Sequence, residues 1–259
     1  MRIRATVGAL TGALALSALA VPAAHADEAD GDVKITKVVV NGGKDVVVGT
    51  SAKKFTVSVT ATDPSGIEVA AATLWHGPNF ANKDGELFFD GGSGLSCAEV
   101  NAKTATCTGT VIADPKKNLK KNFLADDWKV FAYAHSEDDD MTVVDSYPTK
   151  ARFKRAAKLT VNASPEPVKK NKTITVSGAL TRANWETRKY AGYTQQPVQL
   201  QFKKKGASSY STVKTVKSDR KGNLKTTVKA SADGTFRYVF AGTSTTPAVT
   251  SAGDFIDVR

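Results

Sequence analysis

Histidine and cysteine are scarce in this chain of 259 residues, which contains three His and two Cys. His25 lies in a segment that we expect to be cleaved off, which leaves His76 and His135. A catalytic zinc ion usually takes three protein ligands, and a Ser-His-Asp triad requires a histidine beside a positioned serine and carboxylate. The G-x-S-x-G motif of α/β-hydrolases is also absent. The sequence therefore argues against an enzyme, and we expect neither catalytic residues nor a bound organic cofactor.

Helical periodicity is nearly absent too, whereas Val, Ile, Phe, Thr and Tyr recur in short alternating runs. Such runs, separated by Gly, Pro, Asn and Asp, are typical of β-strands and turns. We expect strands in the first half at 34–40, 45–48, 55–61, 67–75, 87–89, 104–112, 128–134 and 151–155, with a helical turn within 113–127. In the second half we expect them at 158–161, 173–177, 198–203, 210–216, 224–228, 235–240 and 255–258. Seven short strands in about 100 residues favour an immunoglobulin-like sandwich, so the predicted fold is all-β, with two such domains in tandem.

The N-terminus carries the parts of a secretory signal peptide. Arg2 and Arg4 precede an apolar run over 5–21, and Ala24-His25-Ala26 forms an A-x-A cleavage site. The run is shorter than the roughly 20 residues needed to span a bilayer, and no later stretch is apolar enough to do so. We expect cleavage after Ala26 and a secreted, extracellular protein without a membrane span.

Charge is distributed unevenly along the remaining chain. Residues 27–156 contain 16 Lys and Arg against 19 Asp and Glu, whereas residues 157–259 contain 18 against 6. This shift coincides with the expected strand that starts at Lys158. We therefore expect an N-terminal domain over 27–156 and a basic C-terminal domain over 157–259, after the signal peptide at 1–26.

Several segments resemble known extracellular modules. The turn DPSGI after the strand TVSVTA is similar to bacterial immunoglobulin-like modules, and the C-terminal half contains LTRANWE, PVQLQFKKKG, DRKGN and GTFRYVFAGTSTT. Together they resemble uncharacterised exported two-domain proteins of high-GC Gram-positive bacteria, some of which bear the generic label calcium-binding protein. The resemblance implies a sandwich fold and secretion, and it transfers no functional residue.

Cys97 and Cys107 are close in sequence and flank what should be a hairpin or tight loop. Two nearby cysteines in an exported protein usually form a disulfide. The alternatives are a metal site or a catalytic thiol, and no paired histidine stands nearby to support either.

The densest acidic cluster is Glu137-Asp138-Asp139-Asp140, followed by Asp145. Calcium takes six to eight oxygen ligands, which a carboxylate-rich turn can supply in part. We consider Asp138, Asp139, Asp140 and Asp145 as calcium ligands, with a solvated strand connection as the alternative. The acidic residues Asp27, Glu28, Asp30 and Asp32 are instead expected to form a disordered N-terminus.

One connection in the basic half interleaves aromatic and cationic residues, namely Arg182, Trp185, Arg188, Lys189, Tyr190 and Tyr193. Such residues can stack on sugars or bases and contact anionic groups. The alternative is that Trp185 and one tyrosine pack over the open end of the sandwich. Further positive charge comes from Lys169, Lys170, Lys172, Lys203, Lys204 and Lys205.

These features predict a non-enzymatic binding or structural protein that associates with cell-wall polymers or other extracellular polyanions through its basic domain. The alternatives are a secreted proteinase inhibitor that presents the loop around Cys97 and Cys107, a calcium-binding module, and an accessory module of an enzyme. Another secreted protein is a possible partner, and no specific nucleic-acid partner is expected.

Overall fold

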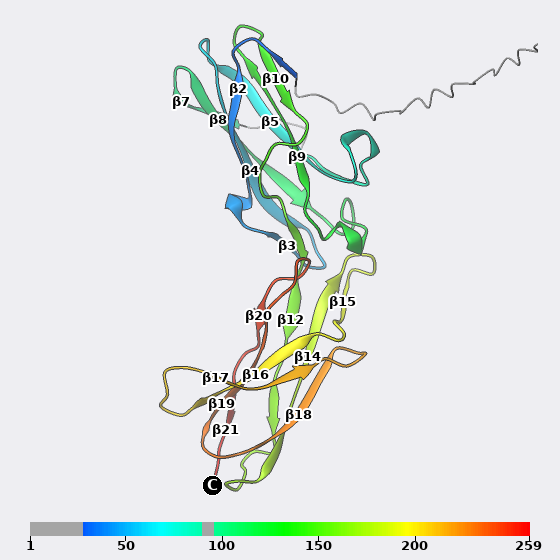
Figure 1. Ribbon diagram of the computed structural model, residues 1–259, viewed down its shortest axis with the longest axis vertical. Helices are drawn as coiled ribbons and strands as arrows, with labels where there is room; N and C mark the ends of the chain where they lie inside the picture. The colour runs from blue at the N-terminus through cyan, green and yellow to red at the C-terminus, as the bar shows by residue number, and fades with distance from the viewer. Residues whose placement is uncertain (1–27, 90–95) are drawn as a thin grey trace, which may run out of the picture.

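The computed structural model describes residues 28–89 and 96–259, and these residues form two β-sandwiches arranged end to end (Figure 1). The predicted all-β fold is confirmed: the regular elements of the described residues are strands, and the helices among them are one-turn 3-10 helices. No helix in the described part of the chain is long and apolar enough to cross a membrane. The predicted signal peptide and Asp27 lie outside the described residues.

The N-terminal sandwich consists of two antiparallel sheets that enclose alternating apolar side chains. One sheet has the order β1 (Glu28–Asp30), β10 (Met141–Val144), β9 (Lys129–Ser136), β5 (Ile67–His76) and β6 (Gly85–Leu87). The other has the order β2 (Lys34–Val40), β4 (Lys53–Thr62), β8 (Thr104–Ala113) and β7 (Ser96–Asn101). Every second residue of β9 is buried, as expected of a strand with one face on the core.

The end of this sandwich nearest the C-terminal domain is closed by short elements. β3 (Val46–Val48) and β11 (Phe153–Arg155) pair in parallel, and the 3-10 turns η1 (Asn41–Gly43) and η3 (Asn122–Leu124) flank them. A further 3-10 turn, η2 (Phe80–Asn82), lies on the loop before β6. The helical turn expected within 113–127 corresponds to η3.

The C-terminal sandwich is built around one long strand, β14 (Thr173–Asn184). It pairs with β12 (Ala157–Leu159), β13 (Asn162–Ser164), β15 (Lys189–Gly192) and β18 (Asn223–Lys229). In the second sheet, β16 (Pro197–Lys204) lies between β17 (Ser211–Lys217) and β19 (Gly234–Phe240), and β19 also pairs with β20 (Val249–Thr250) and β21 (Asp254–Ile256). The core between these sheets includes Ile174, Leu200 and Tyr238.

The structure corrects one expectation about the chain and extends another. Glu28 and Asp30 belong to β1, which pairs with β10 in the register Glu28↔Val143 and Asp30↔Met141, so this acidic segment is ordered by backbone hydrogen bonds at the open edge of a sheet. The strand predicted at 173–177 continues to Asn184 as β14, because its second half pairs with β12 and β15.

The two sandwiches share side chains at their junction. The hydrophobic core of the N-terminal sandwich includes Ala183 and Trp185, which come from the C-terminal half of the chain. Ala156 and Ala183 are joined by a backbone hydrogen bond of 2.8 Å, and Ala156 also donates to Val48 O at 2.9 Å. The joint is therefore packed and hydrogen-bonded.

Candidate functional site

Each of the two described histidines lies against carboxylates. His76 ends β5, with its Nδ1 2.5 Å from Asp84 Oδ1, and its ring lies near those of Trp128 and Phe123. His135 Nδ1 is 2.9 Å from Glu68 Oε2 on the surface of the β5–β9 sheet. Among the described residues, neither imidazole forms a hydrogen bond to a serine, threonine or cysteine side chain.

The predicted disulfide is confirmed. Cys97 on β7 and Cys107 on β8 are directly opposite each other in the strand register and are bonded. Cys107 is buried, whereas every residue of β7 is exposed. The bond therefore attaches an exposed edge strand to the core of the N-terminal sandwich.

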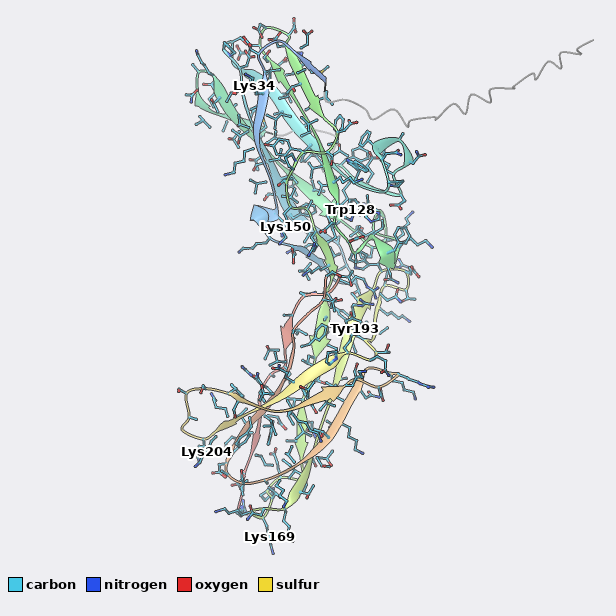
Figure 2. The ribbon with its side chains drawn as sticks, in the orientation of Figure 1. Lys34, Trp128, Lys150, Lys169, Tyr193 and Lys204 are labelled. Carbon is cyan, nitrogen blue, oxygen red and sulfur yellow. A yellow bond between two sulfur atoms is a disulfide. The ribbon has the colours of Figure 1, made fainter. Side chains whose placement is uncertain are left out.

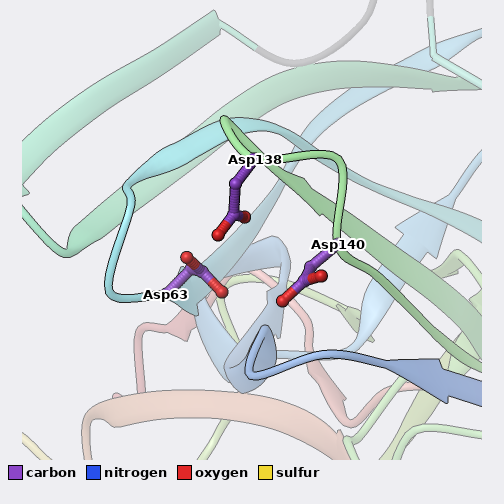
Figure 3. Close-up of side chains that lie close together, drawn as sticks. All are labelled: Asp63, Asp138 and Asp140. Atoms are coloured by element: carbon purple, nitrogen blue, oxygen red, sulfur yellow. The ribbon is translucent and has the colours of Figure 1, made fainter.

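The four residues predicted to bind calcium lie at three separate positions in the structure. Asp138 and Asp140 lie with Asp63 in one cluster, in which one carboxylate oxygen of each residue lies within 4.8 Å of the other two (Figure 3). Asp139 has a φ of 70° and points into solvent with its side chain 96% exposed. Asp145 follows the opposite end of β10, where its backbone carbonyl accepts a hydrogen bond from Trp75 Nε1. Asp139 and Asp145 are therefore not members of the cluster.

Asp63 is the residue that the sequence interpretation missed. It lies in the turn between β4 and β5, far in sequence from the turn between β9 and β10 that carries Asp138. The two turns lie side by side because β5 pairs with β9. The only sequence signal is that Asp63 begins the DPSG turn, which by itself indicates a turn and no metal.

Hydrogen bonds hold the three carboxylates in place. Asp63 Oδ1 accepts from the backbone N and the hydroxyl of Ser65, at 2.7 and 2.6 Å. Asp138 Oδ1 accepts from the hydroxyls of Ser136 and Ser65, which keep the pKa of this carboxyl below its ordinary value. Asp140 Oδ2 accepts from the backbone N of Asp32 at 2.8 Å. Each carboxylate thus uses one oxygen for these contacts.

The predicted ligand-binding connection is instead a hairpin at the junction of the sandwiches. Arg182 is on β14, Trp185 and Arg188 are in the turn, Lys189 and Tyr190 are on β15, and Tyr193 follows it. Trp185 is completely buried, and its indole N–H donates to Val48 O at 3.3 Å. Stacking of Trp185 on a ligand is therefore excluded in this structure, because the ring fills the end of the N-terminal core.

The two tyrosines of this hairpin contact cations of the same chain. Lys158 Nζ lies 4.1 Å from the centre of the Tyr190 ring, and the Arg182 guanidinium lies 3.9 Å from that of Tyr193. Both rings are partly buried against the cores. Arg188 and Lys189 are exposed. Of the six predicted residues, these two cations are the ones most open to solvent.

The remaining cations are spread over the surface of the C-terminal sandwich. Lys169 and Lys204 project near the end far from the junction, whereas Tyr193 lies close to the junction (Figure 2). Lys170, Lys204 and Lys205 line a shallow hollow with Asp233 at this far end. Two of the 18 cations in residues 157–259, all of which are described, form ion pairs with carboxylates: Lys205 with Asp233 and Arg259 with Asp257.

Several acidic side chains of this sandwich accept hydrogen bonds from backbone N–H groups. Asp219 Oδ1 accepts from the backbone N of Lys221 and Asn223 at 2.7 and 2.8 Å. Asp233 Oδ1 accepts from Val258 N, and Asp254 Oδ2 accepts from Ala163 N. The backbone hydrogen bonds lower the pKa of Asp219 and of Asp233. These carboxylates therefore stabilise turns and strand ends, and among these three fully described residues Asp233 also forms an ion pair, with Lys205.

Comparisons with known proteins give structural similarity and no sequence match. No protein-family model and no curated protein matches the chain. Solved structures that align with it include the fibronectin(III)-like modules of Clostridium thermocellum CbhA, with 12% identity over 86% of this chain and 93% of that chain at a TM-score of 0.31. A marsupial T cell receptor aligns with 12% identity over 88% of this chain and 73% of that one, at a TM-score of 0.37.

Proposed function

We propose that this protein is an exported, non-enzymatic binding module whose basic C-terminal sandwich attaches to extracellular polyanions such as anionic cell-wall polymers. The signal-peptide features of residues 1–26 and the disulfide between Cys97 and Cys107 support export. The paired sandwiches form a rigid scaffold that presents one basic and one near-neutral surface.

The observation that carries the proposal is the lack of local compensation for the positive charge. Eighteen cations share the C-terminal sandwich with six acids, and two of those cations form ion pairs in this fully described half of the chain. The excess of 18 cations over six acids gives this sandwich a net positive field, because so few of the cations are paired locally. Such a field favours association with polymers of negative charge.

The test is binding of the mature chain, residues 27–259, to an immobilised glycerol-phosphate polymer and to isolated cell walls at increasing salt. Binding through this field should be strong at low ionic strength and should fade as salt rises, since the Debye length is ~10 Å at 0.1 M and ~3 Å at 1 M. A neutral polysaccharide should retain nothing. Binding that is equally strong to the neutral polymer, or that does not change with salt, would contradict the proposal.

Two lysine variants locate the binding surface. Lys169→Gln, Lys170→Gln and Lys204→Gln together remove three exposed cations from the far end of the C-terminal sandwich. The matched control, Lys116→Gln, Lys117→Gln and Lys120→Gln, removes three exposed cations from the N-terminal sandwich. We expect the first variant to bind roughly threefold or more weakly at low salt, and the control to change little, because screening confines each charge to its neighbourhood.

A further inference from the structure

The cluster of Asp63, Asp138 and Asp140 contains a carboxylate oxygen that is buried and has no partner. Asp63 is 2% exposed, and its Oδ2 has no hydrogen-bond partner among the described residues. Its Oδ1 is occupied by Ser65, so Oδ2 is the atom left over. A buried, unpartnered carboxylate oxygen is costly unless a cation or a donor compensates it.

The surroundings of this oxygen add negative charge. Figure 3 shows that the carboxylates of Asp138 and Asp140 converge on that of Asp63 from the turn between β9 and β10. Lys34 and Lys103 line the hollow beside Asp63, but no ion pair in the described residues joins either lysine to the three carboxylates. Three acids that meet at one point repel one another unless a cation lies between them.

We propose that Asp63, Asp138 and Asp140 bind one calcium ion at the tip of the N-terminal sandwich. Each residue contributes a carboxylate oxygen, and water completes the six to eight ligands that calcium takes. Two oxygens on one ion can be separated by at most twice the metal–oxygen distance, which is about 4.6–5.2 Å for calcium and about 4.0–4.2 Å for magnesium. One carboxylate oxygen of each residue lies within 4.8 Å of the other two, an upper limit that falls within the range one calcium ion can span.

The hydroxyls of Ser65 and Ser136 would orient these ligands. The single hydroxyl proton of Ser65 is shared between Asp63 Oδ1 at 2.6 Å and Asp138 Oδ1 at 2.9 Å, and Ser136 donates to Asp138 Oδ1. Hydrogen bonds to the outer oxygen of a ligating carboxylate fix its direction and are a regular part of metal sites. Asp140 is held in the same way by the backbone N of Asp32.

The ion would join three segments that are distant in sequence. Asp63 is in the turn between β4 and β5, Asp138 and Asp140 are in the turn between β9 and β10, and Asp140 in turn contacts the segment after β1 through Asp32. Calcium at this point should stabilise both turns and the edge strand β1 together.

The test is thermal unfolding of the mature chain, residues 27–259, in chelator and at increasing calcium chloride, together with calorimetric titration by calcium. Extracellular calcium modules bind with dissociation constants of about 10⁻⁴–10⁻³ M, so 10 mM calcium should raise the melting temperature by roughly 3–10 °C. One equivalent of calcium should bind, and magnesium should give a smaller shift. No shift and no heat with calcium, or a shift that is as large with magnesium, would overturn the assignment.

Three variants separate a metal ligand from a merely structural carboxylate. Asp63→Asn keeps an Oδ1 acceptor for Ser65 and replaces the unpartnered oxygen with a donor. We expect this variant to lose the calcium-dependent shift and to melt in chelator no lower than the natural protein, because one of three repelling charges is gone. Asp140→Asn should also lose the shift.

Asp139→Asn is the matched control, because it removes the same charge from the same turn at a side chain that is 96% exposed. It should retain the full calcium response. Loss of the response in Asp139→Asn, or its retention in Asp63→Asn, would show that general charge in the turn is responsible and would overturn the site.

Discussion

The indole N–H of Trp185 donates a hydrogen bond to the backbone carbonyl of Val48, 137 residues earlier in the chain, at 3.3 Å. Trp185 belongs to the turn of the β14–β15 hairpin, and Val48 ends β3 in the N-terminal sandwich. The backbone N of Trp185 is also bound by Asn122 Oδ1 at 3.0 Å, and Asn122 Nδ2 donates to Asn184 Oδ1 at 3.1 Å. One hairpin of the C-terminal sandwich therefore completes the core of the N-terminal one.

Replacement of Trp185 tests this joint. Because the ring is fully buried, Trp185→Ala should lower the free energy of unfolding by about 3–5 kcal/mol. Urea unfolding followed by circular dichroism measures the loss. Lys189→Ala, an exposed change on the same hairpin, is the control and should stay within about 0.5 kcal/mol of the natural protein. Similar stability of the two variants would contradict the packing of the joint.

The ion pairs of Asp45 predict how the stability of the N-terminal sandwich responds to acid. Asp45, next to β3, lies 2.8 Å from Lys150 Nζ and 2.9 Å from Lys154 Nζ, on either side of the start of β11. The hydrogen bond from Lys150 is the largest influence on this carboxyl, and Lys154 adds to it, so its pKa falls below the ordinary 3.8 despite partial burial. A folded-state pKa below the unfolded one stabilises the protein above that unfolded value, and this part of the stability is lost as the pH falls through the folded pKa.

Asp45→Asn should therefore lower the free energy of unfolding by on the order of 1 kcal/mol at pH 7. The difference in the free energy of unfolding between this variant and the natural protein should shrink once the pH falls below 3.8. Urea unfolding at pH 7, 5 and 3 measures it, with Glu99→Gln, at an exposed carboxyl on β7, as the control. A difference that stays constant from pH 7 to pH 3 would mean that the charge of Asp45 contributes nothing.

Tyr238 predicts a response to alkali in the C-terminal sandwich. Its hydroxyl donates to Val176 O at 3.0 Å, and burial raises its pKa from 10.0 to about 12. Folding thus favours the neutral form of the Tyr238 phenol. The contribution of this group to the free energy of unfolding is therefore complete below pH 10 and is lost as the pH rises towards 12.

Tyr238→Phe should lower the free energy of unfolding by about 1 kcal/mol at pH 7, because the hydrogen bond to Val176 O is lost. The variant should lose less stability than the natural protein between pH 10 and about 12. Absorbance titration should show an ionisation near pH 12 in the natural protein and in Tyr190→Phe that is missing from this variant. Ionisation of every tyrosine of the natural protein near pH 10 would contradict the burial of Tyr238.

Local physical chemistry made much of the fold predictable. Alternating runs such as 55–61 and 235–240 are strands because one face of each is covered by a core, and the sequence period shows that face directly. The disulfide was predictable because Cys97 and Cys107 are the only cysteines and lie ten residues apart. Short or polar strands such as β1, β10 and β15 were missed, because backbone pairing with a distant neighbour creates them and leaves little periodicity.

The candidate sites also depend in part on the sequence alone and in part on the tertiary structure. The sequence by itself determined the all-β fold, the excess of cations after residue 157 and the acidic character of 137–140, because composition and period are properties of the chain alone. Only the tertiary structure decided that Asp63 joins Asp138 and Asp140 while Asp139 faces solvent, and that Trp185 is part of a core. These relationships depend on which turns the pairing of β5 with β9 brings together and on where β14 ends, and no local pattern records a contact between residues so far apart in the chain.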